Sequence, residues 1–553
     1  MTKIKHLFIA VMTVLLFTQA TSEEKTFEYH EVAATVMINA LKAESEKSFL
    51  KQLYTQLLFV PVWMNEEAPS PAANALFEYV KNDPTLDRDG RLYQELLSLE
   101  EQMHDIYASH GKLTQKIELE FKISQFYKEY TNYAYFGSIN WGAFQARISN
   151  LIVNGVSTEW ILHRPKASVI GMLEKALFGA DLANELEKAA PQKYHYKQLQ
   201  QKVAEYREIK ANGGWEKVML TETLKPGKSA DGVPSLRQRL IVTKDYLPCE
   251  ESSDDALVYD ECLQKAVKYF QIRNGLADDG EVGPKTLSVL NKSVDERIQT
   301  LLLNLDRIKW FNDPKSQRHI IINIPDFMLY FEQDGELIQT FRTIVGTPKN
   351  PTPIFSNSVK TIVLNPQWNV PKSIIQKEYI PKILRNPNVL RKERIEVYSG
   401  WGRDASIVDP SSVNWAAYRY SKTVPYRLAQ TAGTHNALGK VKFLFPNKFS
   451  VYMHDTPTKH LFEKDKRAFS HGCIRLQKPR ELLETFSTFE ENIDFEKSQK
   501  ILKGTKKKYL PLDEKVPIDV IYLTAWVDYD GKLQFRNDVY RYDEMQLKSF
   551  KTW

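Results

Sequence analysis

The sequence predicts a multidomain α+β protein: a mainly helical N-terminal part, a small three-helix module, and a mainly β C-terminal part with a helical and irregular insertion. Three observations lead to this prediction. The chain has 553 residues, more than one hydrophobic core usually organises, so two to four domains are expected. Residues 27–224 repeat apolar side chains at helical spacing. From His319 onward the pattern changes to short runs of β-branched and aromatic residues.

Composition and charge narrow the class of protein. Hydrophobic residues make up 42% of the chain and aromatic residues 12%, which is typical of a folded soluble protein. The formal net charge is +6, small for this length, and basic residues are spread along the chain apart from 506–508. A nucleic-acid partner is therefore not expected. A mildly basic surface suits an acidic polymer, but an ordinary solvated surface is the simpler explanation.

The N-terminus has the three-part layout of a secretory signal. Lys3 and Lys5 precede an apolar run over residues 7–17, and small or polar residues follow over 18–22. The apolar run is shorter than the roughly 20 residues that a membrane-spanning helix needs, although an uncleaved anchor is an alternative. We therefore expect residues 1–22 to be a signal peptide and the protein to be exported, with no stable membrane span once the signal is cleaved.

Residues 23–225 are expected to form a helical scaffold domain. The segment is rich in Leu, Ala, Glu and Lys, and prolines mark breaks between its helices. One helical face is predicted to consist of Leu119, Ile123, Phe126, Tyr127 and Tyr130. The segment contains no cysteine and no cluster of catalytic residue types, so a structural role is the simpler interpretation.

A Pro-, Gly- and Ser-containing stretch, LKPGKSADGVP, leads into a compact three-helix module at 232–295. Cys262, Ala266 and Phe270 recur at helical spacing, and Pro284 stands where a short helix begins. The run AVKYFQIRNGLADDGEVGPKTL is similar to the small peptidoglycan-binding domain of cell-wall enzymes in its Phe-Gln pair, Gly-Leu, Asp-Gly turn and Gly-Pro. This resemblance implies a peptidoglycan-binding domain.

Residues 316–553 are expected to form a mainly β domain. Asp334-Gly335 lies between two strand-like runs and is a strong signal for a tight hairpin. Further strands are predicted at TIVLNPQWNV, KVKFLF, FSVYMH and PIDVIYLTAWV, the last of which completes the same domain. Residues 371–427 interrupt this pattern and are expected to be a helical and irregular insertion.

The three cysteines indicate where a reactive thiol lies. Cys249 and Cys262 are close together in the sequence and could pair in an oxidising compartment, which would leave Cys473 unpaired. A free cysteine is more often a small buried hydrophobe than a nucleophile. A nucleophilic cysteine needs a base nearby. The candidate bases are His435, His454, His460 and His471.

The surroundings of these groups differ. His454 ends the strand-like run FSVYMH, so a β framework would hold its ring still. His471 is two residues from Cys473, where a tight turn need not direct its side chain at the thiol. Gly472 allows a close backbone approach, and Arg475 raises the local positive potential. Zinc is a competing interpretation, with His454, His471 and Cys473 as ligands, but no C-x-x-C or H-E-x-x-H spacing supports it.

The stretch HDTPTKHLFEKDKRAFSHGCIRL resembles the active-site signature of L,D-transpeptidases with the YkuD-type fold: a histidine, a connecting stretch, then Ser-His-Gly-Cys-(Ile/Val)-Arg. Long members of this family carry a helical scaffold domain and a peptidoglycan-binding domain ahead of the catalytic domain, in the order expected here. The resemblance covers most of the chain, strongly over about 320–479. It implies a periplasmic protein with a catalytic domain at 316–553 and a capping insertion at 371–427.

The resemblance also implies residue roles. Cys473 would be the nucleophile and His454 the general base and acid, with Asp455 orienting the second ring nitrogen of His454 through its carbonyl or its carboxylate. Supporting residues around the turn and the oxyanion would be Ser470, His471, Gly472 and Arg475. Substrate-binding residues would be Tyr452, Trp368 and Asn436.

The implied reaction is peptidoglycan L,D-transpeptidation with no metal or organic cofactor. Cys473 would attack a tetrapeptide stem, release D-alanine and form a thioester, which the side-chain amine of a second stem would resolve to a 3→3 cross-link. Donor and acceptor stem peptides are the expected partners. One alternative is an L,D-carboxypeptidase, in which water resolves the same thioester. An alternative of another class is a non-catalytic peptidoglycan-binding scaffold protein.

Overall fold

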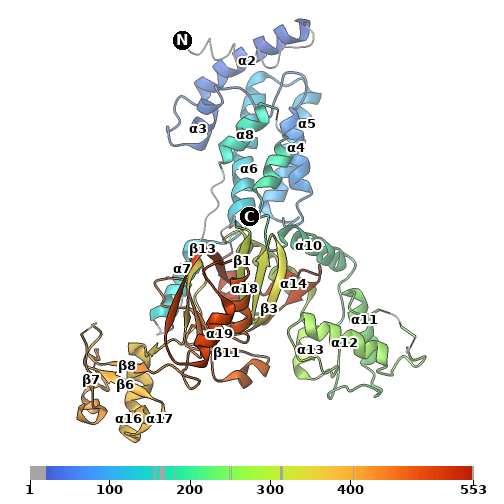
Figure 1. The fold of residues 1–553 in the computed structure, drawn as a ribbon. Helices are drawn as coiled ribbons and strands as arrows, with labels where there is room; N and C mark the ends of the chain where they lie inside the picture. The colour runs from blue at the N-terminus through green and yellow to red at the C-terminus, as the bar shows by residue number, and fades with distance from the viewer. Residues whose placement is uncertain are drawn as a thin grey trace. The chain divides into compact units, whose positions relative to one another are not determined.

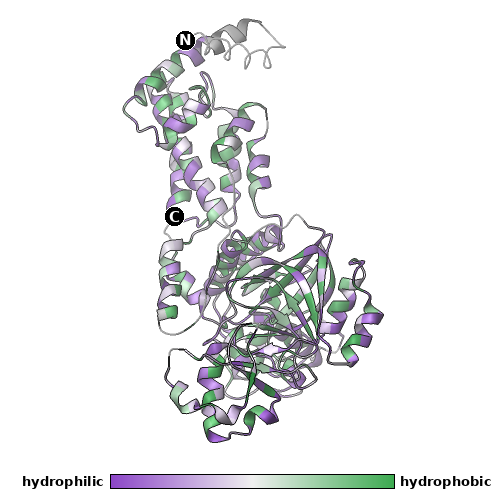
Figure 2. Ribbon diagram, turned by 60° about the vertical axis from the view of Figure 1, so that its left-hand side comes forward, coloured by the Kyte–Doolittle hydropathy of each residue, from purple (hydrophilic) through white to green (hydrophobic). Residues whose placement is uncertain are grey.

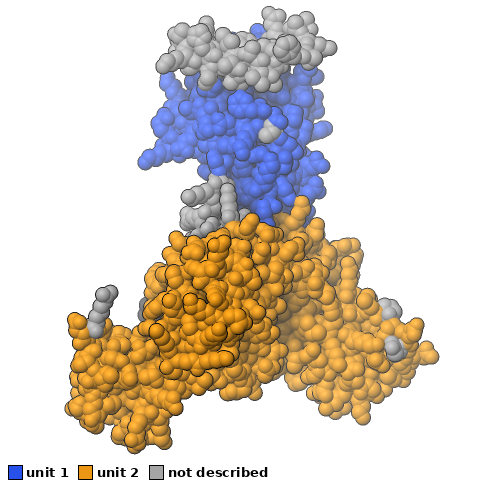
Figure 3. All heavy atoms as spheres, in the orientation of Figure 1, with its two compact units in different colours: residues 1–138, 165–192, 551–553 blue, residues 139–164, 193–550 orange. Residues whose placement is uncertain are grey.

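The structure is a computed structural model, and it describes residues 20–550 except 154–155, 157–158, 162–167, 180, 248, 251, 312–315, 403 and 422. The chain divides into two compact units (Figure 3). Unit 1 comprises residues 1–138, 165–192 and 551–553, and unit 2 comprises residues 139–164 and 193–550. The expected signal peptide, residues 1–22, lies almost entirely outside the described residues. In the part that is described, no helix is both long and apolar enough to cross a bilayer.

Unit 1 is helical, as the sequence predicts. Its helices are α2 (Ala20–Ala40), α3 (Phe49–Gln56), α4 (Pro71–Lys81), α5 (Arg91–Ala108), α6 (Leu113–Phe136), α8 (Val169–Leu177) and α9 (Leu182–Ala189). Ser48, Ser70 and Ser168 cap the starts of α3, α4 and α8, because each side chain accepts a backbone N–H of the first turn. Helices α4, α5 and α6 run side by side (Figure 1).

The apolar face predicted for α6 is confirmed. Each of its five residues is at most 2% exposed and packs into the core of unit 1: Leu119, Ile123, Phe126, Tyr127 and Tyr130. Their spacing of three, four and one residues brings them to one side of the helix. This face anchors α6 among its neighbours.

A buried carboxylate joins α6 to the segment before α4. Glu120 is fully buried, and it accepts hydrogen bonds from the Tyr54 hydroxyl (2.7 Å) and from the backbone N–H groups of Val62 (2.6 Å), Trp63 (2.9 Å) and Met64 (2.9 Å). Burial raises the pKa of Glu120 to about 7, although these donors favour the ionised form. Because the fold engages both carboxylate oxygens, we interpret this group as structural.

The predicted three-helix module is present in unit 2. Its helices are α11 (Val233–Val242), α12 (Glu261–Arg273) and α13 (Pro284–Leu290). Cys262, Ala266 and Phe270 are buried along one face of α12, and Pro284 is the first residue of α13. These local features confirm the helices that the sequence pattern indicates.

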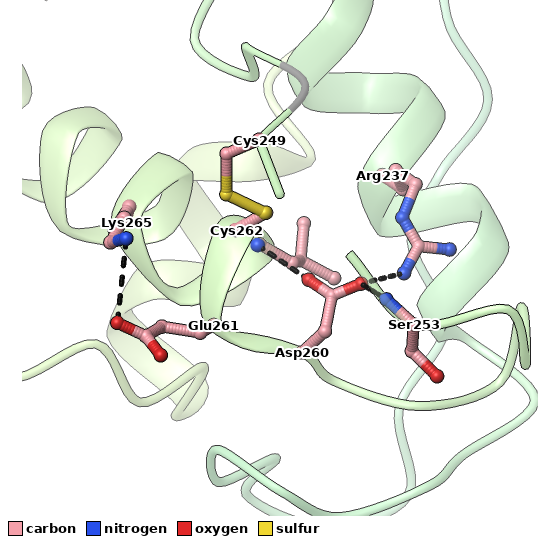
Figure 4. Close-up of a disulfide and its surroundings, with 8 residues drawn as sticks. Arg237, Cys249, Ser253, Asp260, Glu261, Cys262 and Lys265 are labelled. Carbon is pink, nitrogen blue, oxygen red and sulfur yellow. Dashed lines mark hydrogen bonds and ion pairs between the residues drawn. A yellow bond between two sulfur atoms is a disulfide. The ribbon is translucent and has the colours of Figure 1, made fainter. Parts of the chain in front are cut away.

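A disulfide closes the loop that leads into α12. Cys249 and Cys262 are joined, with their Cα atoms 5.8 Å apart (Figure 4). Beside it, Asp260 caps α12 by accepting a backbone N–H of the first turn at 2.7 Å, and it pairs with Arg237 at 2.9 Å. The pairing that the sequence left open is therefore present. Cys473 is the one free cysteine of the chain.

The β domain of unit 2 is built on a nine-stranded sheet in the order β11-β3-β12-β10-β9-β4-β13-β1-β2. Because β2 also pairs with β3, the strands from β3 to β2 close into a ring, which leaves few free edges. The strands are β1 (Arg318–Asn323), β2 (Met328–Gln333), β3 (Glu336–Gly346), β4 (Phe355–Leu364), β9 (Val441–Leu444), β10 (Met453–His454), β11 (Ala468–Ser470), β12 (Ile474–Leu476) and β13 (Lys508–Ile521). Hydrophobic residues recur along these strands (Figure 2).

The hairpin predicted at Asp334-Gly335 joins β2 to β3. Both residues have positive φ, 53° for Asp334 and 84° for Gly335. This combination is typical of a type I′ turn, whose twist matches that of the two strands. The prediction is therefore confirmed by the backbone itself.

Unit 2 contains further helices and a separate two-stranded sheet. They are α7 (Trp141–Val153), α10 (Tyr196–Ala211), α14 (Val294–Ile308), α18 (Pro479–Ser487), α19 (Phe495–Lys503), β14 (Ala525–Val527), β15 (Leu533–Phe535) and α20 (Tyr542–Leu547). Helices α7 and α10 belong to segments 139–164 and 193–225, which the sequence assigned to the helical scaffold but which lie in unit 2. The exact sequence boundary of the scaffold domain stays a prediction.

The insertion at 371–427 contains two strands, β6 (Ile395–Tyr398) and β7 (Ile407–Val408), that the sequence did not predict. Its helical parts are α15 (Lys372–Ile374), η1 (Ile375–Tyr379), α16 (Ile380–Arg385), α17 (Val389–Lys392), η2 (Pro410–Ser412) and η3 (Trp415–Tyr418). A separate sheet has the order β5-β8-β6-β7, with β5 (Trp368–Asn369), β6 (Ile395–Tyr398), β7 (Ile407–Val408) and β8 (Arg427–Gln430). Strands of two to four residues are too short to show an alternating pattern. The insertion also has its own hydrophobic core.

A buried cluster of charged groups fixes β1 against its neighbours. His319 Nε2 lies 3.1 Å from a carboxylate oxygen of Asp519 on β13, and His319 Nδ1 lies 3.4 Å from one of Glu332 on β2. The Tyr194 hydroxyl also donates to Asp519, at 2.5 Å. Burial on its own would lower the pKa of His319, but the hydrogen bonds and charges of the two carboxylates outweigh it and raise this pKa to about 9.

We expect unit 2 to lose stability in mildly alkaline solution. A histidine whose pKa is raised to about 9 in the folded state stabilises the fold fully below its ordinary pKa of about 6.5, and the contribution is lost as the pH rises through about 9. Its upper bound is about 3 kcal/mol of unfolding free energy. Thermal unfolding at about pH 6 and pH 9.5 measures the change. In a His319→Gln variant the pH dependence should be smaller, and an equally steep fall there would contradict this explanation.

Candidate active site

Three neighbouring strands bring the candidate residues together. β10 pairs in parallel with β12 and antiparallel with β9, so His454 stands opposite Arg475 on one side and Lys442 on the other. The adjacent residues of the same three strands, Met453, Ile474 and Phe443, also stand opposite one another, and all three are fully buried on the other face of the sheet. Because side chains alternate along a strand, Lys442, His454 and Arg475 share the face that points away from this core.

A tight turn delivers Cys473 to the start of β12. The Ser470 hydroxyl donates to the Cys473 carbonyl at 2.6 Å and accepts the Gly472 N–H at 3.1 Å. Gly472 has φ +110°, a conformation that other residues rarely adopt. The Thr352 hydroxyl donates to the Gly472 carbonyl at 2.9 Å. The sequence-predicted residues Ser470 and Gly472 therefore shape the turn that carries the thiol.

The thiol of Cys473 is partly exposed and lies close to the residues just before β10. The Ile474 N–H donates to the Tyr452 carbonyl at 3.0 Å, and the Cys473 sulfur lies 3.8 Å from the Ser450 carbonyl oxygen. Burial raises the pKa of the thiol, while hydrogen bonds from Tyr452 and the charge of Lys442 oppose that rise. The thiol is therefore the resting form, and Tyr452 and Lys442 offset part of the effect of burial.

His454 is held in one tautomer. Its side chain is 4% exposed, and its Nδ1 lies 2.5 Å from the Asp455 carbonyl oxygen. Since a carbonyl only accepts, Nδ1 carries the hydrogen and Nε2 keeps a free lone pair. Burial, together with the charge of Arg475, lowers the pKa of His454 to about 3. The ring is therefore neutral at physiological pH and able to accept a proton at Nε2.

The sequence left open whether the carbonyl or the carboxylate of Asp455 orients His454, and the structure distinguishes the two. Its carbonyl faces the His454 ring, whereas its carboxylate accepts hydrogen bonds from the Lys440 N–H (2.8 Å), the Thr456 N–H (2.8 Å) and the Lys459 ammonium (2.7 Å). A Cβ at Gly439 would lie 2.3 Å from the Asp455 carboxyl carbon. The carboxylate thus fixes the loop, and the carbonyl orients the ring.

His471 points to a different partner. Its Nε2 lies 2.6 Å from the Glu378 carboxylate, which belongs to η1 of the insertion. The His471 side chain is about half exposed. This ion pair connects the insertion to the turn that carries Cys473. Among the described residues, no group of three or more histidine, cysteine or carboxylate side chains is arranged to hold a metal ion.

The predicted substrate-binding residues are placed differently from one another. Tyr452 is in the site, with its ring 5.6 Å from the His454 ring. Trp368 lies on β5, where it packs 6.3 Å from the Tyr379 ring of the insertion. Asn436 is fully buried, and its amide nitrogen donates to two backbone carbonyls at 3.1 and 2.9 Å. The structure therefore places Tyr452 beside the thiol, whereas the Asn436 side chain forms hydrogen bonds within its own loop.

Lys442 is the residue of this site that sequence reasoning missed. Its ammonium lies 3.4 Å from the centre of the Tyr452 ring. The alternation in KVKFLF places Lys442 on the polar face of a strand, which is an ordinary place for a lysine. Only the pairing of β9 with β10 brings it beside His454, and no local signal reveals that pairing.

Three parts of the chain match models of known families. Residues 317–506 match YkuD, the "L,D-transpeptidase catalytic domain". Residues 48–203 match "Scaffold domain", and residues 229–290 match "Putative peptidoglycan binding domain". The chain therefore carries a YkuD-type catalytic domain, a peptidoglycan-binding domain and a scaffold domain. The resemblance inferred from the sequence is confirmed.

A curated relative is similar to part of the chain. A Haemophilus influenzae protein named "Putative L,D-transpeptidase" is 32% identical over 247 residues. The match covers 44% of this chain and 48% of that protein, so it spans about half the length of the relative.

Two solved structures are similar at low identity. An L,D-transpeptidase from Mycobacterium smegmatis is 13% identical with a TM-score of 0.18, over 37% of this chain and 58% of that one. An L,D-transpeptidase from Stackebrandtia nassauensis is 15% identical with a TM-score of 0.22, over 55% of this chain and 97% of that one. At these values neither structure bears on function.

Proposed function

We propose that this protein is a peptidoglycan L,D-transpeptidase that forms 3→3 cross-links through a thioester on Cys473. The observation that carries the proposal is the position of the one free thiol. It stands at the start of β12, next to the strand whose His454 is buried, neutral and oriented by the Asp455 carbonyl. The match of residues 317–506 to the L,D-transpeptidase catalytic domain supports the same reaction.

The proposed first step acylates the thiol. The Cys473 sulfur forms a bond to the carbonyl carbon of the third stem residue, and the bond from that carbon to the nitrogen of the terminal D-alanine breaks. His454 Nε2 takes the thiol proton and gives it to the departing amine. The backbone N–H of Cys473 has no acceptor among the described residues, so it is available to the oxyanion that develops on the carbonyl.

The proposed second step transfers the acyl group. The side-chain amine of a second stem attacks the thioester carbonyl, a new amide bond forms, and the bond from carbon to sulfur breaks. His454 accepts a proton from the attacking amine and returns one to the sulfur, so the enzyme is regenerated. A neutral His454 suits both steps, because each begins with proton transfer to Nε2.

The other parts of the chain support a role at the cell wall. The family match at 229–290 supports peptidoglycan as the polymer that this protein binds. The signal-like residues 1–22 support export to the periplasm, where stem peptides are found. Glu120 is buried and both of its carboxylate oxygens accept hydrogen bonds, which supports a structural role for unit 1. The match of residues 48–203 to a scaffold domain supports the same role.

Products of a defined reaction test the proposal. Purified protein is incubated with disaccharide tetrapeptides, and the products are identified by mass spectrometry. Dimers joined through their third residues, together with free D-alanine, are expected. Tripeptides without dimers would contradict transpeptidation and indicate an L,D-carboxypeptidase. No release of D-alanine would contradict both activities and favour a non-catalytic peptidoglycan-binding protein.

A further inference from the structure

Lys442 has surroundings that are unusual for a lysine. It lies on β9 opposite His454 and is half-buried, with its ammonium over the face of the Tyr452 ring at 3.4 Å from the centre. A cation gains attraction from an aromatic face when water is excluded. A lysine withdrawn from water is normally paired with a carboxylate. Among the described residues, no carboxylate forms an ion pair with Lys442.

Arg475, on the other side of His454, also has no carboxylate partner among the described residues. Its guanidinium donates to the Thr458 hydroxyl at 3.3 Å, and within the described part of the chain no carboxylate pairs with it. The nearby carboxylates are already engaged: Glu378 pairs with His471, and Asp455 pairs with Lys459. Two cations therefore flank the site without an anion.

The groups that face the thiol show which of them could carry the negative charge that Lys442 and Arg475 lack. They are Lys442 from β9, His454 from β10, Arg475 from β12, and Tyr452 from the residue before β10. His454 is neutral, and burial raises the pKa of Tyr452 further above its ordinary value. Cys473 is then the group among them that most readily loses a proton to become an anion, although burial raises the pKa of its thiol.

The charge of Lys442 acts on both groups of the reacting pair. Burial lowers the pKa of Lys442 to about 8, and negative charge on Cys473 raises it again. In return, the ammonium lowers the pKa of Cys473 against the effect of burial. It also lowers the pKa of His454, after burial and Arg475. One cation thus favours negative charge on the sulfur and keeps the imidazole free to accept a proton.

We propose that Lys442 is a positioning residue of this site, whose ammonium, held over the Tyr452 ring, stabilises negative charge on the Cys473 sulfur. The inference rests on the proposed role of Cys473 as nucleophile. It also gives Tyr452 a second task beside substrate contact, because its ring holds the ammonium near the thiol.

Alkylation by neutral iodoacetamide tests the proposal without any substrate. Cys249 and Cys262 are joined, so the reagent reports on Cys473 alone. Rates are measured from about pH 5 to pH 10 for the full chain and for Lys442→Met and Lys442→Arg. Lys442→Met should react roughly tenfold more slowly near pH 7, with its inflection moved to higher pH. Lys442→Arg keeps the charge and should stay within about threefold of the native rate.

Two controls distinguish the loss of the Lys442 charge from a disturbed fold. Lys360→Met removes an exposed lysine from β4 of the same sheet and should leave the alkylation profile unchanged. Thermal unfolding verifies each variant, and Lys442→Gln replaces Lys442→Met if the latter does not fold. A native-like profile in the uncharged variant, or equal slowing in Lys442→Arg, would overturn the proposal. Native protein that alkylates as expected but makes no dimers would instead refute the proposed transpeptidation.

Discussion

Replacing Cys473 by alanine is expected to abolish the release of D-alanine from disaccharide tetrapeptides. The substitution removes the sulfur that would form the thioester, and the other two cysteines are joined in a disulfide. We expect the initial rate to fall by at least ~10⁴-fold, because the remaining groups offer no covalent route. Mass spectrometry of free D-alanine and of the stem peptides measures the loss.

Binding to isolated sacculi is the matched control for this variant. The family match to a peptidoglycan-binding domain ends at residue 290, far from Cys473 in the sequence, so Cys473→Ala should bind as the native protein does. D-alanine release that persists at the native rate would refute the assignment of the nucleophile. Loss of sacculus binding together with activity would point to misfolding, which thermal unfolding then verifies.

Features set by local sequence were predictable. The buried face of α6 follows from helical spacing alone, and the hairpin at Asp334-Gly335 follows from the preference of that pair for positive φ. The start of α13 follows from Pro284, which suits the first helical position. In each case, residues close together in the sequence determine the structure, so no knowledge of the tertiary fold is needed.

Features set by strand pairing were not predictable. The sheet in the insertion depends on β6 and β7, which are too short to show alternation. Lys442 joins the candidate site only because β9 pairs with β10 in one register, and a shift by one residue would turn its side chain to the opposite face. The partner of His471 was equally hidden, because Glu378 lies about 90 residues earlier in the insertion.

The choice between the two histidines leads to the second large expected effect. Replacing His454 by alanine should slow acylation of Cys473 by roughly 10²- to 10⁴-fold, because it removes the proton acceptor at Nε2. His471→Ala is the matched control, since it removes an imidazole close to the thiol in sequence. Its ion pair with Glu378 is half-exposed and contributes little free energy, so we expect activity within about threefold of native. Rates of D-alanine release compare the two variants.

The pH profile distinguishes a lost base from a disturbed fold. Burial lowers the pKa of His454 to about 3, so the native rate should show no fall near pH 6.5, where an ordinary histidine becomes protonated. Without His454, attack depends on the small fraction of ionised thiol. The rate should then rise about tenfold per pH unit until the raised pKa of Cys473 is reached. A fall near pH 6.5 in the native protein, or a greater loss in His471→Ala than in His454→Ala, would transfer the role of base away from His454.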